Sequence, residues 1–444
     1  MKNITQEHLN QQRDAFLSDR ANRIAMNAVT QDGIDNAIHA ANTAKDHQFQ
    51  FTIDLKQGKR TNQKQSGRCW MFASLNVMRY NVIHSLNLED FEFSESYPLF
   101  FDKYERANFF FESILKTTNE PLNSRLIAYL LQEPMGDGGQ WDMFVNLVKK
   151  YGLVPKEAMP ETFQSSNTRD MNEYLTKLLR QGARKLRTGA KSGAGEDELQ
   201  NLKDQLMEEI YRVLTISLGV PPTSFEFAVR DKDGKYIHET SITPQEFFRK
   251  YVGYDVDHTF SLINAPTEDK PFGKTFTVAY LGNVVEGRPV HYLNLTIESL
   301  KQAAIAQLKE SQPVWFGSDV GKFSHRKEGY LSADTVAAED LFQVSFDMTK
   351  EQLLDYGDSQ MTHAMVITGV QLDENENPVR WKVENSWGNE VGNDGYFVMS
   401  DDWFTRFVYQ IVVNEKFLTN EERAQLKQEP IVLQPWDPMG SLAR

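Results

Sequence analysis

The stretch QSGRCWMFA, residues 65–73, contains Cys69, the only cysteine among the 444 residues of the chain. Apolar residues at the spacing of a helix follow it: Phe72, Leu75, Met78 and Val82. This period predicts a helix with one buried face that begins close to Cys69. Unpaired N–H groups at a helix N-terminus stabilise a thiolate, and Gly67 permits a close approach to that turn. The stretch therefore indicates an activated thiol, although a buried cysteine that acts as a small apolar side chain fits it equally well.

Polar residues elsewhere in the chain supply the groups that a thiol nucleophile requires. Gln63 precedes the cysteine, and its amide together with the Cys69 N–H would form an oxyanion hole. His363 opens the strand-like run HAMVITGV and would take the thiol proton, while Asn385 would orient the imidazole by accepting from its other N–H. Trp387 would then cover the contact between His363 and Asn385. Each residue alone also fits a structural role, but the set in this order indicates a catalytic site.

The composition excludes several other classes of protein. A net charge of −14 repels polyphosphate, and no basic cluster interleaved with aromatic residues occurs, so we do not expect nucleic-acid binding. The scattered histidines contain no HExxH or paired CxxC spacing, and we expect neither a metal nor another cofactor. A lone cysteine forms no intrachain disulfide. No long apolar run and no signal-peptide pattern is present, so we expect a cytoplasmic protein without a membrane span.

The first half of the sequence has helical periodicity. Residues 1–46 and 97–132 show helix-like patterns, and GDGGQW at 136–141 interrupts the second region before another helix that ends at Gly152. Residues 168–188 and 197–217 each place apolar residues on one face and flank the flexible connector GAKSGAG. They predict a helical hairpin whose apolar edge contacts a partner.

The second half of the sequence has the pattern of short strands. A β-hairpin is predicted to turn at Asp233 and Gly234, and TFTVAYL at 275–281 is a further strand candidate. Four short runs rich in Val, Ile and aromatic residues follow: VWFGSDV, HAMVITGVQL, RWKVENSW and GYFVMS. Their spacing predicts a small antiparallel sheet or barrel.

QSGRCWMFA, HAMVITGV and NSWGNEVGNDGYF together resemble the active-site blocks of the papain-like cysteine peptidases. The resemblance implies an α+β fold with a helical lobe and a β-barrel-like lobe, here with a long helical and mixed insertion. GDGGQW resembles the glycine pair of that family, so Gly138 and Gly139 would hold the substrate as an added strand. Ser66 replaces a cysteine that the secreted members use in a disulfide. Together with the long separation of Cys69 from His363, this resembles the branch of bleomycin hydrolase and bacterial aminopeptidase C.

This resemblance divides the chain into five expected segments. They are an N-terminal extension on the core at 1–60, a helical lobe with the nucleophile at 61–160, an insertion with the hairpin arm at 161–310, a β-rich lobe with His363 and Asn385 at 311–428, and a C-terminal arm that enters the active site at 429–444.

The same resemblance implies a thiol aminopeptidase that acts on peptides with a free N-terminus. The tail EPIVLQPWDPMGSLAR would block the non-primed side of the cleft, and a terminal carboxylate would face the substrate α-amino group. By this resemblance, Arg444 would supply that carboxylate, or Ala443 would do so if the enzyme trims its own last residue. A homohexamer is expected, with the hairpin as the assembly arm. The alternatives are an endopeptidase of the same fold, bleomycin-type amide hydrolysis, a catalytically silent ring and a transglutaminase-like acyltransferase.

Overall fold

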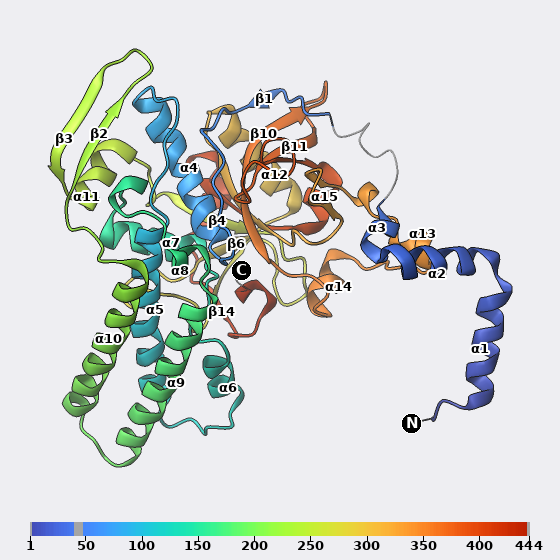
Figure 1. Ribbon diagram of the computed structural model, residues 1–444, viewed down its shortest axis with the longest axis horizontal. Helices are drawn as coiled ribbons and strands as arrows, with labels where there is room; N and C mark the ends of the chain where they lie inside the picture. Colours follow the sequence, from blue (N-terminus) through green and yellow to red (C-terminus); the bar gives the residue numbers. More distant parts are fainter. Residues whose placement is uncertain (1, 40–47, 442–444) are drawn as a thin grey trace.

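The computed structural model describes residues 2–39 and 48–441. These residues form a helical lobe and a lobe built on one large sheet, and the two meet along helix α4 (Cys69–Ser85) (Figure 1). Within the described ranges, none of the helices is both long and apolar enough to cross a membrane.

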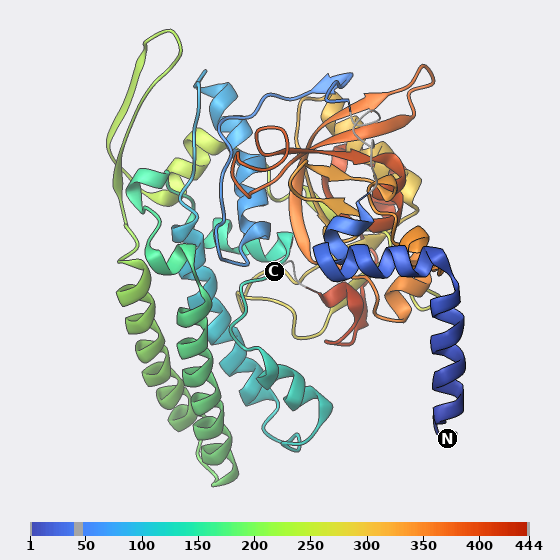
Figure 2. The same ribbon diagram turned by 45° about the vertical axis from the view of Figure 1, so that its right-hand side comes forward.

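The N-terminal segment is helical, as the sequence predicts, but little of it is buried. Its helices are α1 (Gln6–Ser18), α2 (Arg20–Asp32) and α3 (Ile34–Ile38), and none of them contains a buried residue. Helices α2 and α3 contact α13 (Ala338–Phe342), whereas α1 projects away from the rest of the molecule (Figure 2). The part of the expected helical stretch at 40–46 lies outside the described residues.

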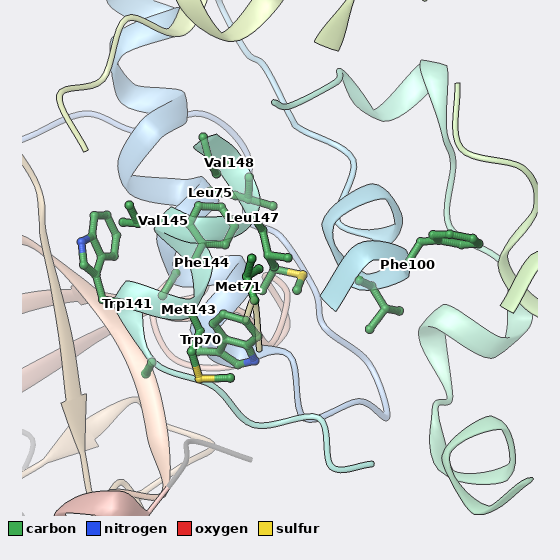
Figure 3. Packing of buried hydrophobic residues seen from close by; sticks show 14 of the residues in the cluster. Trp70, Met71, Leu75, Phe100, Trp141, Met143, Phe144, Val145, Leu147 and Val148 are labelled. Carbon is green, nitrogen blue, oxygen red and sulfur yellow. The ribbon is translucent and has the colours of Figure 1, made fainter. Parts of the chain in front are cut away.

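Helix α4 begins at Cys69, in agreement with the sequence prediction. The expected single buried face is wrong, because residues on every side of the helix are buried. The physical reason is its position between the lobes: α4 contacts strands β7 (Val314–Ser318) and β10 (His363–Leu372) as well as helix α7 (Trp141–Tyr151). Figure 3 shows Trp70, Met71 and Leu75 of α4 packed against Phe144 and its neighbours on α7.

The other helices of the helical lobe extend outward from α7. They are α5 (Ser96–Lys116), α6 (Arg125–Gln132), α8 (Phe163–Ser166), α9 (Arg169–Lys191), α10 (Glu196–Leu218) and the short η2 (Lys156–Ala158). Helix α5 contacts α7, and α9 and α10 contact α5. Helices α9 and α10 form the predicted hairpin beside α5 (Figure 1). The connector is shorter than expected, because α9 continues to Lys191. Tyr174 and Ile216 on the hairpin are 62% and 80% exposed, so an apolar edge is present.

The predicted β-hairpin around Gly234 is confirmed as a separate two-stranded sheet. Strand β2 (Phe225–Arg230) pairs antiparallel with β3 (Tyr236–Ile242). Helix α11 (Pro244–Phe247) and the π-helical η3 (Phe248–Val252) follow, and Phe247 packs on Phe225 and Phe227 of β2.

The large sheet contains the predicted strands, but it is not the small antiparallel sheet that the sequence indicates. Its order is β14-β5-β6-β4-β13-β7-β10-β11-β12-β9-β8, with β1 paired to β10. The pairs β4 with β6, β5 with β14 and β9 with β12 are parallel. The remaining strands are β1 (Ile53–Asp54), β4 (Thr259–Ile263), β5 (Lys274–Val278), β6 (Tyr292–Asn294), β8 (Ser324–His325), β9 (Tyr330–Leu331), β11 (Pro378–Glu384), β12 (Tyr396–Ser400), β13 (Val408–Asn414) and β14 (Ile431–Leu433).

Helices and short turns lie between or after the strands of the large sheet, and several of them contribute residues to a hydrophobic core of this lobe. They are α12 (Ile297–Lys309), α14 (Lys350–Asp355), α15 (Asp401–Phe407), α16 (Asn420–Gln425) and the short turns η4 (Ala333–Thr335), η5 (Glu415–Phe417) and η6 (Pro438–Gly440). Trp381 and Phe404 stack in this core. The sheet therefore combines strands from 259–294 with strands from 314–414, which the sequence analysis placed in separate segments.

Candidate active site

Cys69 is fully buried at the N-terminus of α4, where the two lobes meet. The carbonyl of Arg68 accepts from the N–H groups of Met71 and Phe72 and thereby forms the first turn of the helix. Burial raises the pKa of the Cys69 thiol to about 12, and hydrogen bonding from the backbone N–H of Ala364 opposes this rise. Since Ala364 follows His363 directly, the thiol lies beside the start of β10.

His363 is held by a hydrogen bond to Asn385. Strands β10 and β11 pair antiparallel, so the residue after the end of β11 returns beside the start of β10. The His363 Nε2 lies 2.9 Å from the Asn385 Oδ1. An amide oxygen only accepts, so Nε2 carries the proton, and Nδ1 is free to accept one from a thiol. Burial lowers the pKa of His363 to about 4, against the raising effect of the Asn385 bond.

The neighbours of Asn385 fix its orientation. Its Oδ1 also accepts from the Ser386 N–H at 2.8 Å. The preceding residue, Glu384, is fully buried and forms ion pairs with Arg60 and with Arg79 of α4. These pairs join the end of β11 to the helix that carries Cys69. Trp387 lies over the imidazole, with ring centroids 4.8 Å apart, as the sequence analysis expects.

Gln63 is attached to the same segment by backbone and side-chain hydrogen bonds. Its N–H donates to the Ser386 carbonyl at 2.8 Å, and its Oε1 accepts from the Ser386 hydroxyl at 2.6 Å. Its Nε2 donates one hydrogen to the Ser66 carbonyl at 2.7 Å. An amide nitrogen carries two hydrogens, so a second donor remains for a ligand. The structure thus brings Gln63, Cys69, His363, Asn385 and Trp387 together.

Arg68, for which the sequence analysis offers no role, is a structural residue of this site. Its guanidinium is fully buried and donates to both carboxylate oxygens of Glu161, at 2.9 and 2.7 Å. Its Nε donates to the Ser66 hydroxyl at 2.9 Å. A bidentate arginine–carboxylate pair restricts orientation as well as position. Arg68 therefore fixes the loop that precedes Cys69.

Asp137 is a second organising residue that the sequence analysis missed. Its carboxylate accepts from the Lys103 ammonium and the Asn172 amide, each at 2.6 Å, and from the Gly67 N–H at 2.9 Å. Burial alone raises the pKa of this carboxyl, but Lys103 and the hydrogen bonds hold it well below its usual range. Asp137 thus connects the nucleophile loop to α5 and α9. The only sequence signal is its position in GDGGQW, between glycines.

The glycine pair lies directly beside Trp70, the residue after Cys69. A Cβ atom at Gly139 would lie 2.4 Å from the Trp70 ring, so only glycine fits there. The Gly138 carbonyl accepts from Arg106 at 2.9 Å. Gly138 also borders a cavity of about 430 Å³ that Trp436 and Ser441 line as well. Packing accounts for Gly139, and binding of a substrate strand by the pair stays a prediction.

The C-terminal segment reaches this cavity from the sheet. Strand β14 pairs with β5, and Ser441 lies between the lobes beyond it. The Ser441 carbonyl accepts from the Gln140 amide at 3.0 Å, and its hydroxyl donates to the Met361 carbonyl at 2.9 Å. The chain end thus contacts the helical lobe just after the glycine pair and the sheet just before His363. The candidate residues Ala443 and Arg444 lie outside the described residues.

Comparison with known proteins gives consistent matches over nearly the whole chain. The model of the Peptidase C1-like family matches residues 3–440. Aminopeptidase C of Streptococcus thermophilus is 49% identical over 417 residues, which cover 94% of this chain and 94% of that protein. Bleomycin hydrolase of Homo sapiens is 42% identical over 422 residues, covering 93% of each.

One solved structure is similar over its full length. The crystal structure of PepW from Lactobacillus rhamnosis HN001 matches with a TM-score of 0.98 and 47% sequence identity, and the match covers 99% of both chains. The arrangement of lobes, sheet and C-terminal segment described above is therefore shared with an experimentally determined structure.

Proposed function

The chain belongs to the Peptidase C1-like family, and on that premise we propose that it is a thiol aminopeptidase that releases N-terminal residues from peptides. The α+β, papain-like architecture expected from the sequence is confirmed by the family match and the PepW structure. The observation that carries the proposal is the hydrogen bond from His363 to Asn385, next to a thiol at the first turn of α4. This geometry suits acyl transfer to sulfur.

In the proposed reaction, Cys69 attacks the carbonyl carbon of the first peptide bond. The thiol proton passes to His363 Nδ1, and the new C–S bond leaves an oxyanion that the Gln63 amide and the Cys69 N–H stabilise. His363 then protonates the leaving amine, and the C–N bond breaks to give a thioester. Water attacks the thioester with His363 as base, which releases the amino acid and returns the proton to sulfur.

The proposed restriction to N-termini rests on the C-terminal segment. Ser441 bridges Gln140 of the helical lobe and Met361 of the sheet lobe, so the C-terminal segment crosses between the lobes at this residue. A cleft closed on one side admits a free N-terminus but not an internal peptide. The carboxylate of Arg444, or of Ala443 after self-trimming, would attract the substrate ammonium group. An endopeptidase is the less favoured alternative, since the similar bacterial proteins are named aminopeptidase C.

We further propose that the enzyme works in the cytoplasm as a homohexamer assembled through the α9–α10 hairpin. The support is the exposed apolar edge of the hairpin, where Tyr174 and Ile216, together with Phe163 of the adjacent α8, border a groove of about 960 Å³. Light scattering of the full chain tests the assembly: a sixfold mass is expected, and a monomer would contradict it.

The direct test of the proposed chemistry is Cys69→Ala. Turnover of a leucine 7-amido-4-methylcoumarin substrate should vanish, and the thermal unfolding midpoint should stay close to that of the unaltered chain. A thiol-directed epoxide should label the unaltered chain at Cys69, as peptide mass spectrometry would show. Retained turnover in the variant would refute the mechanism. Absence of both labelling and turnover in the unaltered chain would instead indicate a catalytically silent binding protein that keeps the fold.

A further inference from the structure

Arg326 lies against the tryptophan that covers the candidate catalytic histidine. It follows β8 in the turn that leads to β9. Its Cζ is 4.0 Å from the centroid of the Trp387 ring, and the same ring contacts His363. Its positive charge also acts on the imidazole, since it contributes to the lowered pKa of His363. The Arg326 guanidinium and the His363 imidazole thus both contact the indole ring of Trp387.

This guanidinium is free to bind an anion. Among the described residues, Arg326 takes part in no ion pair and no hydrogen bond, and its side chain is exposed. By contrast, the buried arginines Arg60, Arg68 and Arg79 are all paired with carboxylates. Stacking on an aromatic ring occupies the face of a guanidinium but leaves the N–H groups on its edge available.

The turn that carries Arg326 is held firmly against the loop after Trp387. The Gly392 N–H donates to the Lys327 carbonyl at 2.9 Å, and the Val398 N–H donates to the Gly329 carbonyl at 2.8 Å. Gly329 has a φ of +76°, and a Cβ atom there would lie 2.6 Å from the Gly392 Cα. The backbone of the turn is therefore fixed, and stacking on Trp387 restricts the guanidinium before any ligand arrives, which reduces the entropy lost on binding.

We propose that Arg326 binds the C-terminal carboxylate of short peptide substrates, so that the enzyme favours di- and tripeptides. This inference rests on the proposed aminopeptidase function. His363 protonates the leaving amine, so the leaving peptide passes the imidazole and the Trp387–Arg326 stack beside it. An extended residue spans about 3.5 Å, so a leaving group of one or two residues ends within ~7 Å of the scissile bond. The Arg326 Cζ lies 4.0 Å and the His363 ring centroid 4.8 Å from the Trp387 ring centroid, so the carboxylate of such a leaving group lies within the range of the paired N–H donors of Arg326.

The test compares Leu-Gly-Gly as the free acid with its C-terminal amide and with leucine 7-amido-4-methylcoumarin. Arg326→Gln should lower kcat/KM for the free acid by about tenfold to a hundredfold, the usual effect of losing a charged hydrogen bond. The loss should lie mainly in KM, because the carboxylate is bound before and during the reaction. The amide and the coumarin substrate should change by less than about twofold, since they offer no carboxylate.

Lys327→Gln is the matched control, because it removes the same charge from the next residue of the turn. It should leave all three substrates unchanged. Equal losses for acid and amide in Arg326→Gln, or no loss for either, would overturn the proposal. A loss of kcat/KM in Arg326→Gln that is seen only with amidated Leu-Glu-Gly would also overturn the proposal. In that case Arg326 would recognise a side-chain carboxylate and not the C-terminal one. Failure of the unaltered chain to cleave the coumarin substrate would refute the aminopeptidase function itself, which separates the two claims.

Discussion

At the scale of single residues, the site is governed by the burial of Cys69 and His363. Burial disfavours a charge on either group, raising the pKa of the thiol to about 12 and lowering that of the imidazole to about 4. Each group alone is therefore neutral. A thiolate and an imidazolium that form together are each other's counter-ion, which is the way buried charges are tolerated. We infer that the proton moves within the pair while substrate is attacked.

The lowered pKa of His363 predicts a pH dependence of stability. An unfolded histidine binds a proton near pH 6.5, whereas the folded one does so near pH 4. Between these values the unfolded state binds more protons, so stability is full above pH 6.5 and falls as the pH drops toward 4. The loss is about 3 kcal/mol for this group. Urea unfolding of the unaltered chain and of His363→Gln at several pH values measures the contribution of His363 to this pH dependence. Equal pH slopes in both proteins would contradict the prediction.

A second prediction at this scale concerns Asp137. Asp137→Asn removes the counter-charge of Lys103, whose side chain is fully buried, and weakens the contact to Gly67. Breaking a buried pair on one side costs about 3–5 kcal/mol. Urea unfolding should show that loss, and kcat/KM should fall because the loop before Cys69 loses its support.

Asp170→Asn is the control for the Asp137 experiment. Asp170 is exposed on α9 and pairs only with the exposed Arg169 among the described residues, so its replacement should change stability by less than about 1 kcal/mol. A similar small effect of Asp137→Asn would show that the loop is held by other contacts.

At the scale of elements, helix α6 holds the C-terminal arm in place. Arg125 lies 4.0 Å from the Trp436 ring centroid, and Tyr129 contacts the same ring edge to face. The Ser124 side chain caps α6 by accepting from the Ile127 N–H. Both contacting residues lie on one short helix, so α6 is the element to which the Trp436 side chain of the arm is attached.

Trp436→Ala should therefore loosen the arm and admit N-blocked peptides. The stacking is worth about 0.5–2 kcal/mol, so cleavage of an N-acetylated aminoacyl amide should rise severalfold relative to the free amine. Val432→Ala, at a position of the same arm that is 62% exposed, is the control and should change neither rate. If Trp436→Ala leaves the ratio of the two rates unchanged, α6 does not hold the arm.

The elements also show which parts of the fold the sequence could predict. The start of α4, the α9–α10 hairpin and the turn at Gly234 follow from local periodicity and turn residues, and all are present. The mixed sheet was not predictable in the same way. Strands β6 and β14 are each only three residues long, and they pair with segments that are distant in the sequence. Such short strands contain too few residues for a periodic signal.

The residues of the candidate site also fall into those that the sequence could predict and those that it could not. Cys69, His363, Asn385 and Gln63 were found because their chemistry and local motifs are visible in the sequence, and the structure brings them together. Asp137 and Arg326 were missed because both lie in loops, and their partners are set by the packing of distant elements. No local pattern marks an arginine that will stack on Trp387.

At the scale of the whole molecule, the site exists only where the lobes and the chain end meet. The helical lobe supplies Cys69, the sheet supplies His363 and Asn385, and Ser441 contacts both. Buried ion pairs of Glu384 with Arg60 and Arg79 connect the lobes next to the reacting groups. The α1–α3 segment lies apart from this junction, on the outside of the sheet lobe (Figure 2). The proposed restriction to peptide N-termini thus depends on how the two lobes and the C-terminal segment meet.

The measurement that tests this account most directly is the ratio of kcat/KM for an N-acetylated and a free aminoacyl coumarin amide, in the full chain and after deletion of Ser441–Arg444. The full chain should cleave only the free amine. The deletion removes the contacts of Ser441 with Gln140 and Met361. It should raise cleavage of the blocked substrate while Cys69→Ala abolishes both reactions. An unchanged ratio after the deletion would contradict the claim that the chain end limits this enzyme to N-termini.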